Sequence, residues 1–197
     1  LGFNLILLPA SVSTLGKSGP EGVNMTVTKN SDAKFGTENW ITNGGGIAVG
    51  KANAFPFYGY EEPYFETSFP SGIKYAEDII LEPNTDYVYE GYVYVNGSIT
   101  PGNRTPLHFY CYTTNTGTVE ACDIIDYRQN LVSGRFVKCY VHFKTKNVNS
   151  NIYFRALVYS TSTVEHVGAK RLSLKKGNRE TEWCQHPNEV ATAAITI

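Results

Sequence analysis

The sequence predicts an all-β fold, either a β-sandwich or a barrel, and three observations lead to this prediction. From residue 86 onward, apolar and polar side chains alternate along most of the chain, which is the period of a strand with one buried face. Segments rich in turn-forming residues, such as "EPNTD", "PGNR" and "KKGN", interrupt the alternation at short intervals. No apolar stripe of helical period with capping residues is found. Short strands with frequent turns are typical of sandwiches and barrels, and not of parallel α/β sheets.

The N-terminal third carries weaker signals. Residues 22–29 and 45–52 predict two short strands around a turn-rich segment. Residues 53–72 contain three prolines, each of which removes a backbone donor and fixes φ, so this stretch is predicted to be a loop or a short edge strand. Its seven rings would plug one end of the core, form a wall on which sugars stack, or pack on a neighbouring subunit. They are Phe55, Phe57, Tyr58, Tyr60, Tyr64, Phe65 and Phe69.

The later strands are predicted by the alternation itself. It covers residues 86–96, 106–114, 134–145, 151–160 and 163–174, and a turn follows at 175–178. Residues 119–132 either contain a helical turn or continue as strand and loop. One side of the alternating strands is ordinary apolar core. It consists of Val93, Val95, Phe109, Val141, Phe143, Phe154 and Val158.

The opposite side of these strands is unusual, because it carries rings with polar tips where a solvated face normally carries Thr, Lys, Glu and Ser. The residues are Tyr92, Tyr94, His108, Tyr110, Tyr112, Tyr140, His142, Tyr153 and Arg155. Such a surface suits a saccharide, whose C–H faces stack on rings while its hydroxyls bond to polar groups. It also suits a subunit interface, where Tyr and Arg are enriched. A third interpretation is that Tyr is simply a good strand former.

The saccharide hypothesis defines the candidate binding residues. They are Tyr92, Tyr94, His108, Tyr110, Tyr112, Tyr153 and Arg155 on the strands, with Trp40, Tyr58 and Tyr60 in the N-terminal loops. Trp40 would be a stacking platform if exposed, and burial is an equal alternative. Tyr92, Tyr110, Tyr153 and Arg155 are predicted to line one groove.

Composition argues against several other functions. Seventeen Lys and Arg against 18 Asp and Glu give a net charge of −1, whereas a nucleic-acid-binding protein needs a basic stripe to neutralise phosphates. No apolar run approaches the roughly 18 residues of a spanning helix, so no membrane insertion is expected. Because the chain begins at Leu1, we expect a processed chain or a piece of a longer protein.

The four cysteines, at positions 111, 122, 139 and 184, form no C-x-x-C pair, so a zinc site is not expected. A chain of 197 residues is large enough to fold without disulfide bridges, so reduced, buried thiols are expected, with a single disulfide bridge as the alternative. Four acids could lend oxygens to a structural calcium, although no loop has a calcium pattern. They are Asp78, Glu82, Asp123 and Asp126. No other cofactor or metal is expected.

No catalytic motif is present, and the chain is not expected to be an enzyme. Glu61, Glu62 and Glu66 lie among aromatics, where a glycosidase pair could be sought. Glycoside hydrolysis needs two carboxyls facing each other, and adjacent carboxyls on an extended chain point apart.

The second half of the chain resembles a known family over about residues 80–185. In that family the last strand commonly reads G-A-K-L, a charged residue, K-G, a short variable stretch and Trp. The matching residues here are Gly168, Ala169, Lys170, Leu174, Lys176, Gly177 and Trp183. This pattern resembles the carbohydrate-binding-module-like jelly rolls of bacteriophage tail fibres, distal tail proteins and baseplate proteins. The chain departs from the pattern by inserting "RLS" and by continuing past Trp183 with "CQHPNEVATAAITI".

The resemblance implies an antiparallel two-sheet sandwich of the jelly-roll type that binds a saccharide of a host cell surface without catalysis. The sandwich would span residues 1–185, and residues 186–197 would lead toward a further domain. The expected partners are a bacterial surface saccharide and other virion proteins, with a homo-oligomer, a trimer, in the full-length protein, on an exposed appendage of the virion. The first alternative is a structural or oligomerisation domain of a virion fibre or decoration protein without sugar binding. The second is a glycan-active enzyme or a binding module attached to an enzyme.

Overall fold

Two antiparallel β-sheets make up the described part of the chain, in a computed structural model. The structure describes residues 28, 38–42, 48–51, 63–68, 72–97, 106–114, 120–159, 164–181 and 183. These residues form eleven strands and no helix, so among them no helix is long and apolar enough to cross a membrane. The predicted antiparallel β-sandwich of the jelly-roll type is therefore confirmed. The division of the chain at residue 185 stays a prediction.

The five-stranded sheet is built around β10. Its strands are β1 (Trp40–Thr42), β4 (Gly72–Tyr75), β5 (Ile79–Leu81), β7 (Leu107–Tyr112) and β10 (Ile152–Tyr159). Short strands β4 and β5 pair with successive halves of β10, and β7 pairs with β10 over six residues. Strand β1 extends the sheet beyond β4.

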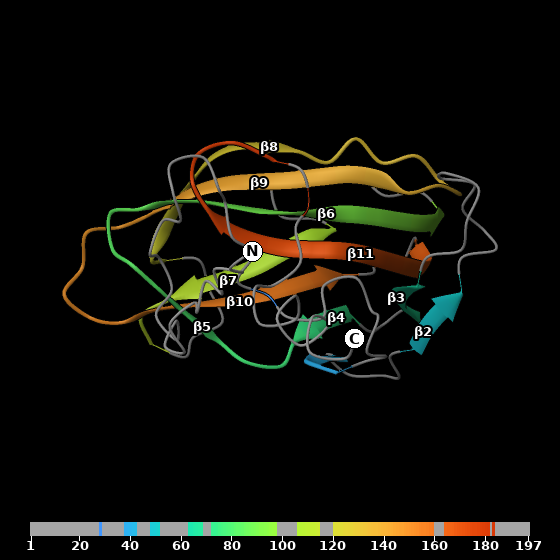
Figure 1. Cartoon of the computed structure of the whole chain (residues 1–197), viewed down its shortest axis with the longest axis horizontal. Helices are drawn as coiled ribbons and strands as arrows, with labels where there is room; N and C mark the ends of the chain where they lie inside the picture. Colours follow the sequence, from blue (N-terminus) through green and yellow to red (C-terminus); the bar gives the residue numbers. More distant parts are fainter. Residues whose placement is uncertain are drawn as a thin grey trace, which may run out of the picture.

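The six-stranded sheet has the order β2-β3-β11-β6-β9-β8. Its strands are β2 (Ala48–Lys51), β3 (Pro63–Ser68), β6 (Asp86–Gly97), β8 (Cys122–Arg128), β9 (Val137–Thr145) and β11 (Val164–Lys176). Three of its five neighbouring pairs, β3–β11, β11–β6 and β6–β9, join strands that are distant in sequence, as expected of a jelly roll (Figure 1). Strand β8 decides the open question about residues 119–132 in favour of a strand.

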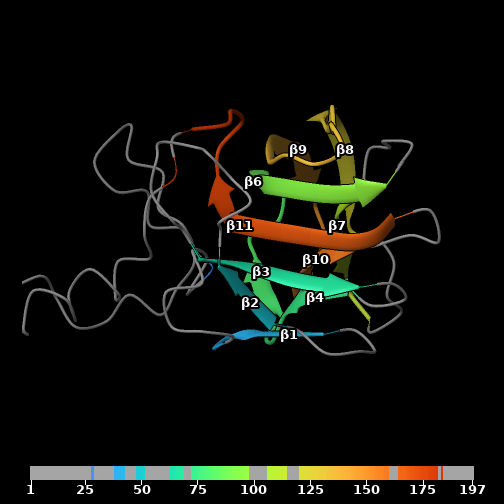
Figure 2. The same cartoon turned by 90° about the vertical axis from the view of Figure 1, so that its right-hand side faces the viewer.

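Strand β3 corrects the prediction for residues 53–72. It lies between β2 and β11, so it is an interior strand and not a loop or an edge strand (Figure 2). Pro63 occupies its first position, where a missing N–H is tolerated. Phe65 is buried in the main core, while Tyr64 packs on the other side with Phe136. The rings at 55, 57, 58, 60 and 69 lie outside the described residues.

The core lies between the sheets and is aromatic at its centre. Phe109, Phe143 and Phe154 stack with ring centroids 4.6 to 5.5 Å apart. All seven predicted core residues are buried. Tyr89 also points inward, and its hydroxyl donates to the Leu157 carbonyl oxygen at 3.2 Å, which satisfies the buried polar group.

Backbone and amide hydrogen bonds close one side of the sandwich. The Gln129 amide, which is buried, accepts from Leu107 N–H at 2.8 Å and donates to the Leu107 carbonyl oxygen at 3.1 Å. Ala121 N–H donates to the Cys111 carbonyl oxygen at 3.0 Å. The two ends of β8 are thereby joined to β7, which belongs to the other sheet.

The "RLS" insertion in the family pattern forms a bulge in β11. The register against β6 shifts between Lys170 and Ser173, and Arg171 adopts a φ of 54°. Leu172 turns inward over Gly91, where a Cβ atom would lie 2.7 Å from the Leu172 Cδ2 atom. The extra residues are thus absorbed locally, and the alternation continues on both sides of the bulge.

Candidate functional site

Strands β7 and β10 place five of the predicted residues on the outer side of the five-stranded sheet. The register pairs Tyr112 with Tyr153 and Tyr110 with Arg155. The intervening residues of both strands are buried between the sheets, so these side chains point outward. We call this surface the tyrosine face. It consists of His108, Tyr110, Tyr112, Tyr153, Arg155 and Tyr159.

One end of the tyrosine face is held by an ion pair. The Arg155 Nε donates to Asp78 Oδ1 at 2.6 Å and Nη2 donates to Oδ2 at 2.8 Å. Nη2 also donates to the Tyr112 hydroxyl at 2.8 Å, and that hydroxyl donates to Asp78. The guanidinium lies 5.5 Å from the centre of the Tyr112 ring. The Arg155 guanidinium is therefore fixed in position, and Asp78 neutralises its charge.

The same contacts determine the protonation of this group. Burial alone would raise the pKa of the Asp78 carboxyl, but the hydrogen bonds from Arg155 and Tyr112 outweigh it and hold that pKa below its usual value. Burial and the bond to Asp78 raise the pKa of Tyr112 to about 12. At neutral pH, Asp78 is thus a carboxylate and Tyr112 keeps its proton.

The other end of the face is a group of rings. The Tyr110 and Tyr159 hydroxyls lie 2.9 Å apart in a hydrogen bond. The His108 ring meets both of them edge to face, with centroid distances of 5.2 Å to Tyr110 and 4.8 Å to Tyr159. All three side chains are half-buried, so part of each ring faces solvent. Tyr159 completes this group although it was not among the predicted binding residues; its alternation phase matches that of Tyr153 and Arg155.

Tyr112 has a different role from its neighbours. Only 2% of it is exposed, and its ring packs 5.8 Å from that of Tyr153. A ligand cannot stack on Tyr112 without displacing what covers it. Tyr112 therefore positions Arg155 through its hydroxyl and packs against Tyr153. It is not itself a ring on which a sugar could stack.

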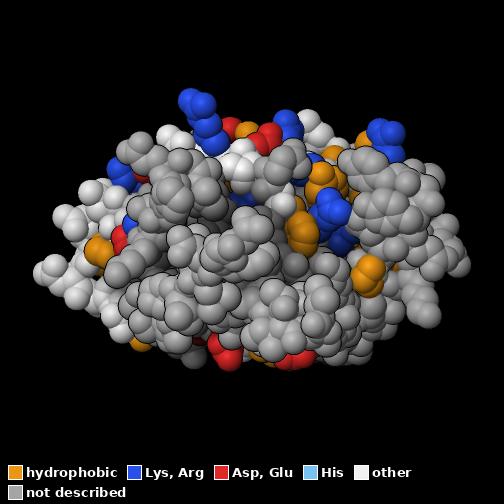
Figure 3. Space-filling model, in the orientation of Figure 1, with side chains coloured by type: hydrophobic (Ala, Val, Ile, Leu, Met, Phe, Trp, Pro, Cys, Tyr) orange, Lys and Arg blue, Asp and Glu red, His pale blue; other side chains and the backbone are white. Residues whose placement is uncertain are grey.

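The predicted four-residue groove is wrong, because Tyr92 lies on the other sheet. Strand β6 pairs with β9 and β11, so Tyr92 and Tyr94 point outward from the six-stranded sheet. There they pack on a small cluster with Tyr64 and Phe136. Figure 3 shows hydrophobic side chains beside Lys or Arg side chains over this region of β6 and β11.

Trp40 is also not a sugar platform. It lies on β1 opposite Tyr75 and is almost completely buried. Its ring centroid is 5.2 Å from that of Phe65 and 5.0 Å from that of Tyr75. Tyr58 and Tyr60, the remaining candidates, lie outside the described residues, as do Glu61 and Glu62.

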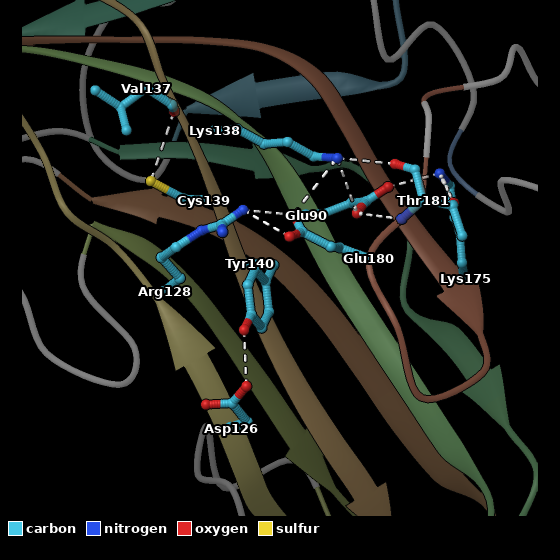
Figure 4. Close-up of polar contacts among 10 residues, drawn as sticks. All are labelled: Glu90, Asp126, Arg128, Val137, Lys138, Cys139, Tyr140, Lys175, Glu180 and Thr181. Carbon is cyan, nitrogen blue, oxygen red and sulfur yellow. Dashed lines mark hydrogen bonds and ion pairs between the residues drawn. The ribbon is translucent and has the colours of Figure 1, made fainter.

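The outer side of the six-stranded sheet carries a network of charges, which we call the charged face (Figure 4). It consists of Glu90, Arg128, Lys138, Tyr140, Lys175, Glu180 and Thr181. At its centre, Lys175 Nζ donates to Glu90 Oε1 at 2.6 Å, and both side chains are buried. Arg128 forms an exposed pair with Glu180 at 2.6 Å. These groups satisfy one another, and the segment after β11 is held against the sheet.

Three of the four acids proposed for calcium are engaged by other partners, and the fourth, Asp123, is exposed with Lys146 Nζ 3.9 Å away. Asp78 binds Arg155, Glu82 accepts from Lys176 at 2.7 Å, and Asp126 accepts from the Tyr140 hydroxyl at 2.7 Å. Within the described ranges, no three His, Cys, Asp or Glu side chains lie together as metal ligands would. Calcium binding by these four acids therefore has no support in the described part of the chain.

Three of the four cysteines are free, buried thiols, and the fourth, Cys184, lies outside the described residues. This agrees with the expectation of reduced thiols at Cys111, Cys122 and Cys139. Their positions differ: Cys139 faces the core from β9, whereas Cys111 and Cys122 lie on either side of the junction between the two sheets.

Comparisons with known proteins describe the fold. No family model matches the sequence, and no curated protein is significantly similar to it. A Stig cyclase of Fischerella sp. TAU, solved in complex with (3Z)-3-(1-methyl-2-pyrrolidinylidene)-3H-indole, superimposes with a TM-score of 0.51. It is 16% identical, and the match covers 80% of this chain and all of the cyclase.

Two carbohydrate-binding proteins superimpose less closely. A family 16 carbohydrate-binding module is 17% identical over 74% of this chain and 96% of its own, with a TM-score of 0.41. The modules of Clostridium thermocellum xylanase 10B with xylohexaose are 13% identical over 83% of this chain and 30% of theirs, with a TM-score of 0.42. The likeness to the cyclase, at 16% identity, concerns the β-sandwich fold alone. None of the three structures is described as a virion protein.

Proposed function

We propose that this chain is a non-catalytic saccharide-binding module and that the tyrosine face is its binding surface. The observation that supports this most directly is the group of half-buried rings around a fixed arginine on one sheet. Tyr110, Tyr153 and Tyr159 present aromatic surface with a hydroxyl at its edge. Sugars have apolar C–H faces bordered by hydroxyls, so their surface complements such rings.

Arg155 adds directed donors to this surface. Its guanidinium carries five N–H donors, and Asp78 and Tyr112 use those on Nε and Nη2. Among the contacts of the described residues, none engages Nη1, so two donors are free for a sugar hydroxyl or ring oxygen. Asp78 neutralises the charge of Arg155. A sugar bound here would therefore not bury an unpaired cation.

We further propose that the module belongs to an adhesion device of a bacteriophage, a tail fibre or baseplate, and recognises a saccharide of the host surface. The support is the motif described above: five of its residues, from Gly168 to Lys176, lie in β11, Gly177 follows the strand, and the Trp183 ring lies 5.4 Å from the guanidinium of Arg171 in β11. Each stacked ring would supply about 1 kcal/mol, so one site binds weakly. A homotrimeric fibre with several copies would compensate through effective concentration.

Binding of bacterial polysaccharides, measured by glycan array and calorimetry, tests the site. The double variant Tyr110→Ala/Tyr153→Ala is expected to lose about 2 kcal/mol, or about thirtyfold in affinity. Tyr140→Ala, which removes a ring from the charged face, is the matched control and should bind normally. Unchanged saccharide affinity in the double variant would contradict the proposal.

An oligomerisation surface is the second candidate, and a specific observation favours it. Ile41 and Ile80 lie on the same outer side of the sheet and are 43% and 49% exposed. Large exposed apolar side chains beside tyrosines are typical of interfaces. Light scattering separates the two candidates: a trimer that dissociates in Ile80→Ser supports the interface, while a monomer that binds saccharide supports the module.

A further inference from the structure

The junction between the two sheets contains a pair of thiols. Ala121 N–H donates to the Cys111 carbonyl oxygen at 3.0 Å, which places Cys122, the next residue, beside β7. Both cysteine side chains point into the core, where Cys111 is 0% and Cys122 is 5% exposed. They belong to different sheets, and the loop between the two strands is short.

We propose that Cys111 and Cys122 are a disulfide site, which a low-molecular-weight disulfide oxidises to a bridge between the two sheets. The bridge needs two thiols on backbones that lie side by side, and the Ala121–Cys111 hydrogen bond at the junction, with both thiols buried in the same core, provides this. The third described thiol lies elsewhere: Cys139 Sγ donates to the Val137 carbonyl oxygen of its own strand at 3.6 Å. The neighbouring Cys122 thiol and burial raise the pKa of the Cys111 thiol. The folded, reduced pair is therefore slow to react, and the bridge forms when the junction opens or while the chain folds.

The exchange proceeds in two balanced steps. Cys122, the more accessible thiol, loses its proton and attacks one sulfur of the oxidant, which releases one thiol and leaves a mixed disulfide. The Cys111 thiolate then attacks the Cys122 sulfur and releases the second thiol. Two electrons and two protons pass from the protein to the oxidant, which is reduced to two thiols.

The bridge would fasten a junction that is otherwise held by hydrogen bonds. At the other end of β8, only the Gln129 amide joins it to β7 within the described residues. Cys111 also directly precedes Tyr112 on β7, so the junction anchors the strand that supports the tyrosine face. A covalent link at this point restricts the unfolded chain and ties the two sheets together.

The test is the bridging equilibrium in glutathione buffers, measured once for the folded chain and once in denaturant. Samples are quenched by alkylation and mapped by mass spectrometry. We expect a single bridge, between residues 111 and 122, with an equilibrium constant about a hundredfold higher in the folded chain than in the denatured one. The oxidised protein should then melt about 5–10 °C higher than the reduced protein.

Variants make the assignment specific. Cys111→Ser and Cys122→Ser should each abolish the bridge, and Cys139→Ser, a matched loss of a buried thiol, should leave it unchanged. An equilibrium constant no higher in the folded chain than in denaturant would overturn the proposal, since it would mean that the fold opposes the bridge. A bridge that includes Cys139 or Cys184 would overturn it as well.

Discussion

The outward faces of the two sheets begin from the same pattern and end in different surfaces. On the five-stranded sheet, alternation presents rings with exposed edges around the paired Arg155 and Asp78. On the six-stranded sheet, it presents Glu90 and Lys175 as a buried ion pair beneath the segment that follows β11. Alternation alone places Tyr140 and His142 of the six-stranded sheet in the same group as the rings of the five-stranded sheet.

The difference teaches that alternation identifies which side of a strand is outward, but not whether that side meets solvent. Coverage by other segments converts an outward face into a second interior, where charges must be paired. The tyrosine face is half-open, as the proposed saccharide site requires. The centre of the charged face serves stability. Substitutions at the centre of the charged face should therefore lower stability, whereas substitutions of the exposed rings on the tyrosine face should lower ligand binding.

The largest expected effect is on the charged face. Glu90→Gln leaves Lys175 charged and buried without its carboxylate, which should lower the free energy of unfolding by about 3–5 kcal/mol. Urea denaturation measures this change. The double variant Glu90→Gln/Lys175→Met removes both charges and should recover much of the loss. A loss below about 1 kcal/mol in the single variant would show that the pair is not desolvated.

A smaller effect compares one hydroxyl on each face. Tyr112→Phe removes a group that bonds to both Asp78 and Arg155, and the expected cost is about 2 kcal/mol. Tyr140→Phe removes a hydroxyl bonded to the exposed Asp126, and no measurable change in stability is expected. Equal costs at the two positions would contradict the contrast between the faces.

The pH dependence of stability sharpens the comparison further. Since the pKa of Asp78 is lowered in the folded chain, its contribution is present above the pKa of an unfolded Asp and is lost as pH falls through the folded pKa. In Arg155→Met, burial would raise the pKa of Asp78, so the loss of stability that Asp78 causes as pH falls should disappear from the acid profile. Urea titrations across the acid range measure this change. Arg128→Met, on the charged face, is the control and should leave this part of the profile in place.

The smallest effect is expected at Lys176, the residue that follows the buried Lys175. Lys176 pairs with Glu82 at 2.7 Å, but the two side chains are 37% and 40% exposed. Lys176→Met should change the free energy of unfolding by about 0.5 kcal/mol or less. The same denaturation experiment applied to Lys175→Met, whose side chain is 1% exposed, provides the contrast. A similar cost for both lysines would mean that burial does not distinguish them.

Local patterns in the sequence were sufficient for the fold class and for the direction of the side chains on β6, β7, β9 and β10. Phe109, Phe154 and Val141 are buried as their phase predicts. The same phase could not separate Tyr92 from Tyr110, because sheet membership depends on pairings between strands far apart in the chain. The alternation of side chains within one strand carries no information about which other strand it pairs with.

Other features needed the tertiary structure for a similar reason. Asp78 stands in a short turn, and only the pairing of β5 with β10 brings it to Arg155. Trp40 lies in a segment rich in turn residues, yet β1 pairs with β4 and carries the ring into the core. The burial of Lys175 could not be predicted from a charged residue beside a turn.

Thr181 has a mechanical consequence. Its carbonyl oxygen accepts from Lys138 at 2.9 Å, its hydroxyl from Lys175 at 2.7 Å, and its N–H donates to Glu90 at 3.3 Å. These partners belong to β9, β11 and β6, which are neighbours in the sheet. Tension on the chain beyond Thr181 would therefore be divided among three strands before it could pull β11 out from between β3 and β6. The tyrosine face belongs to the other sheet, away from this point of attachment.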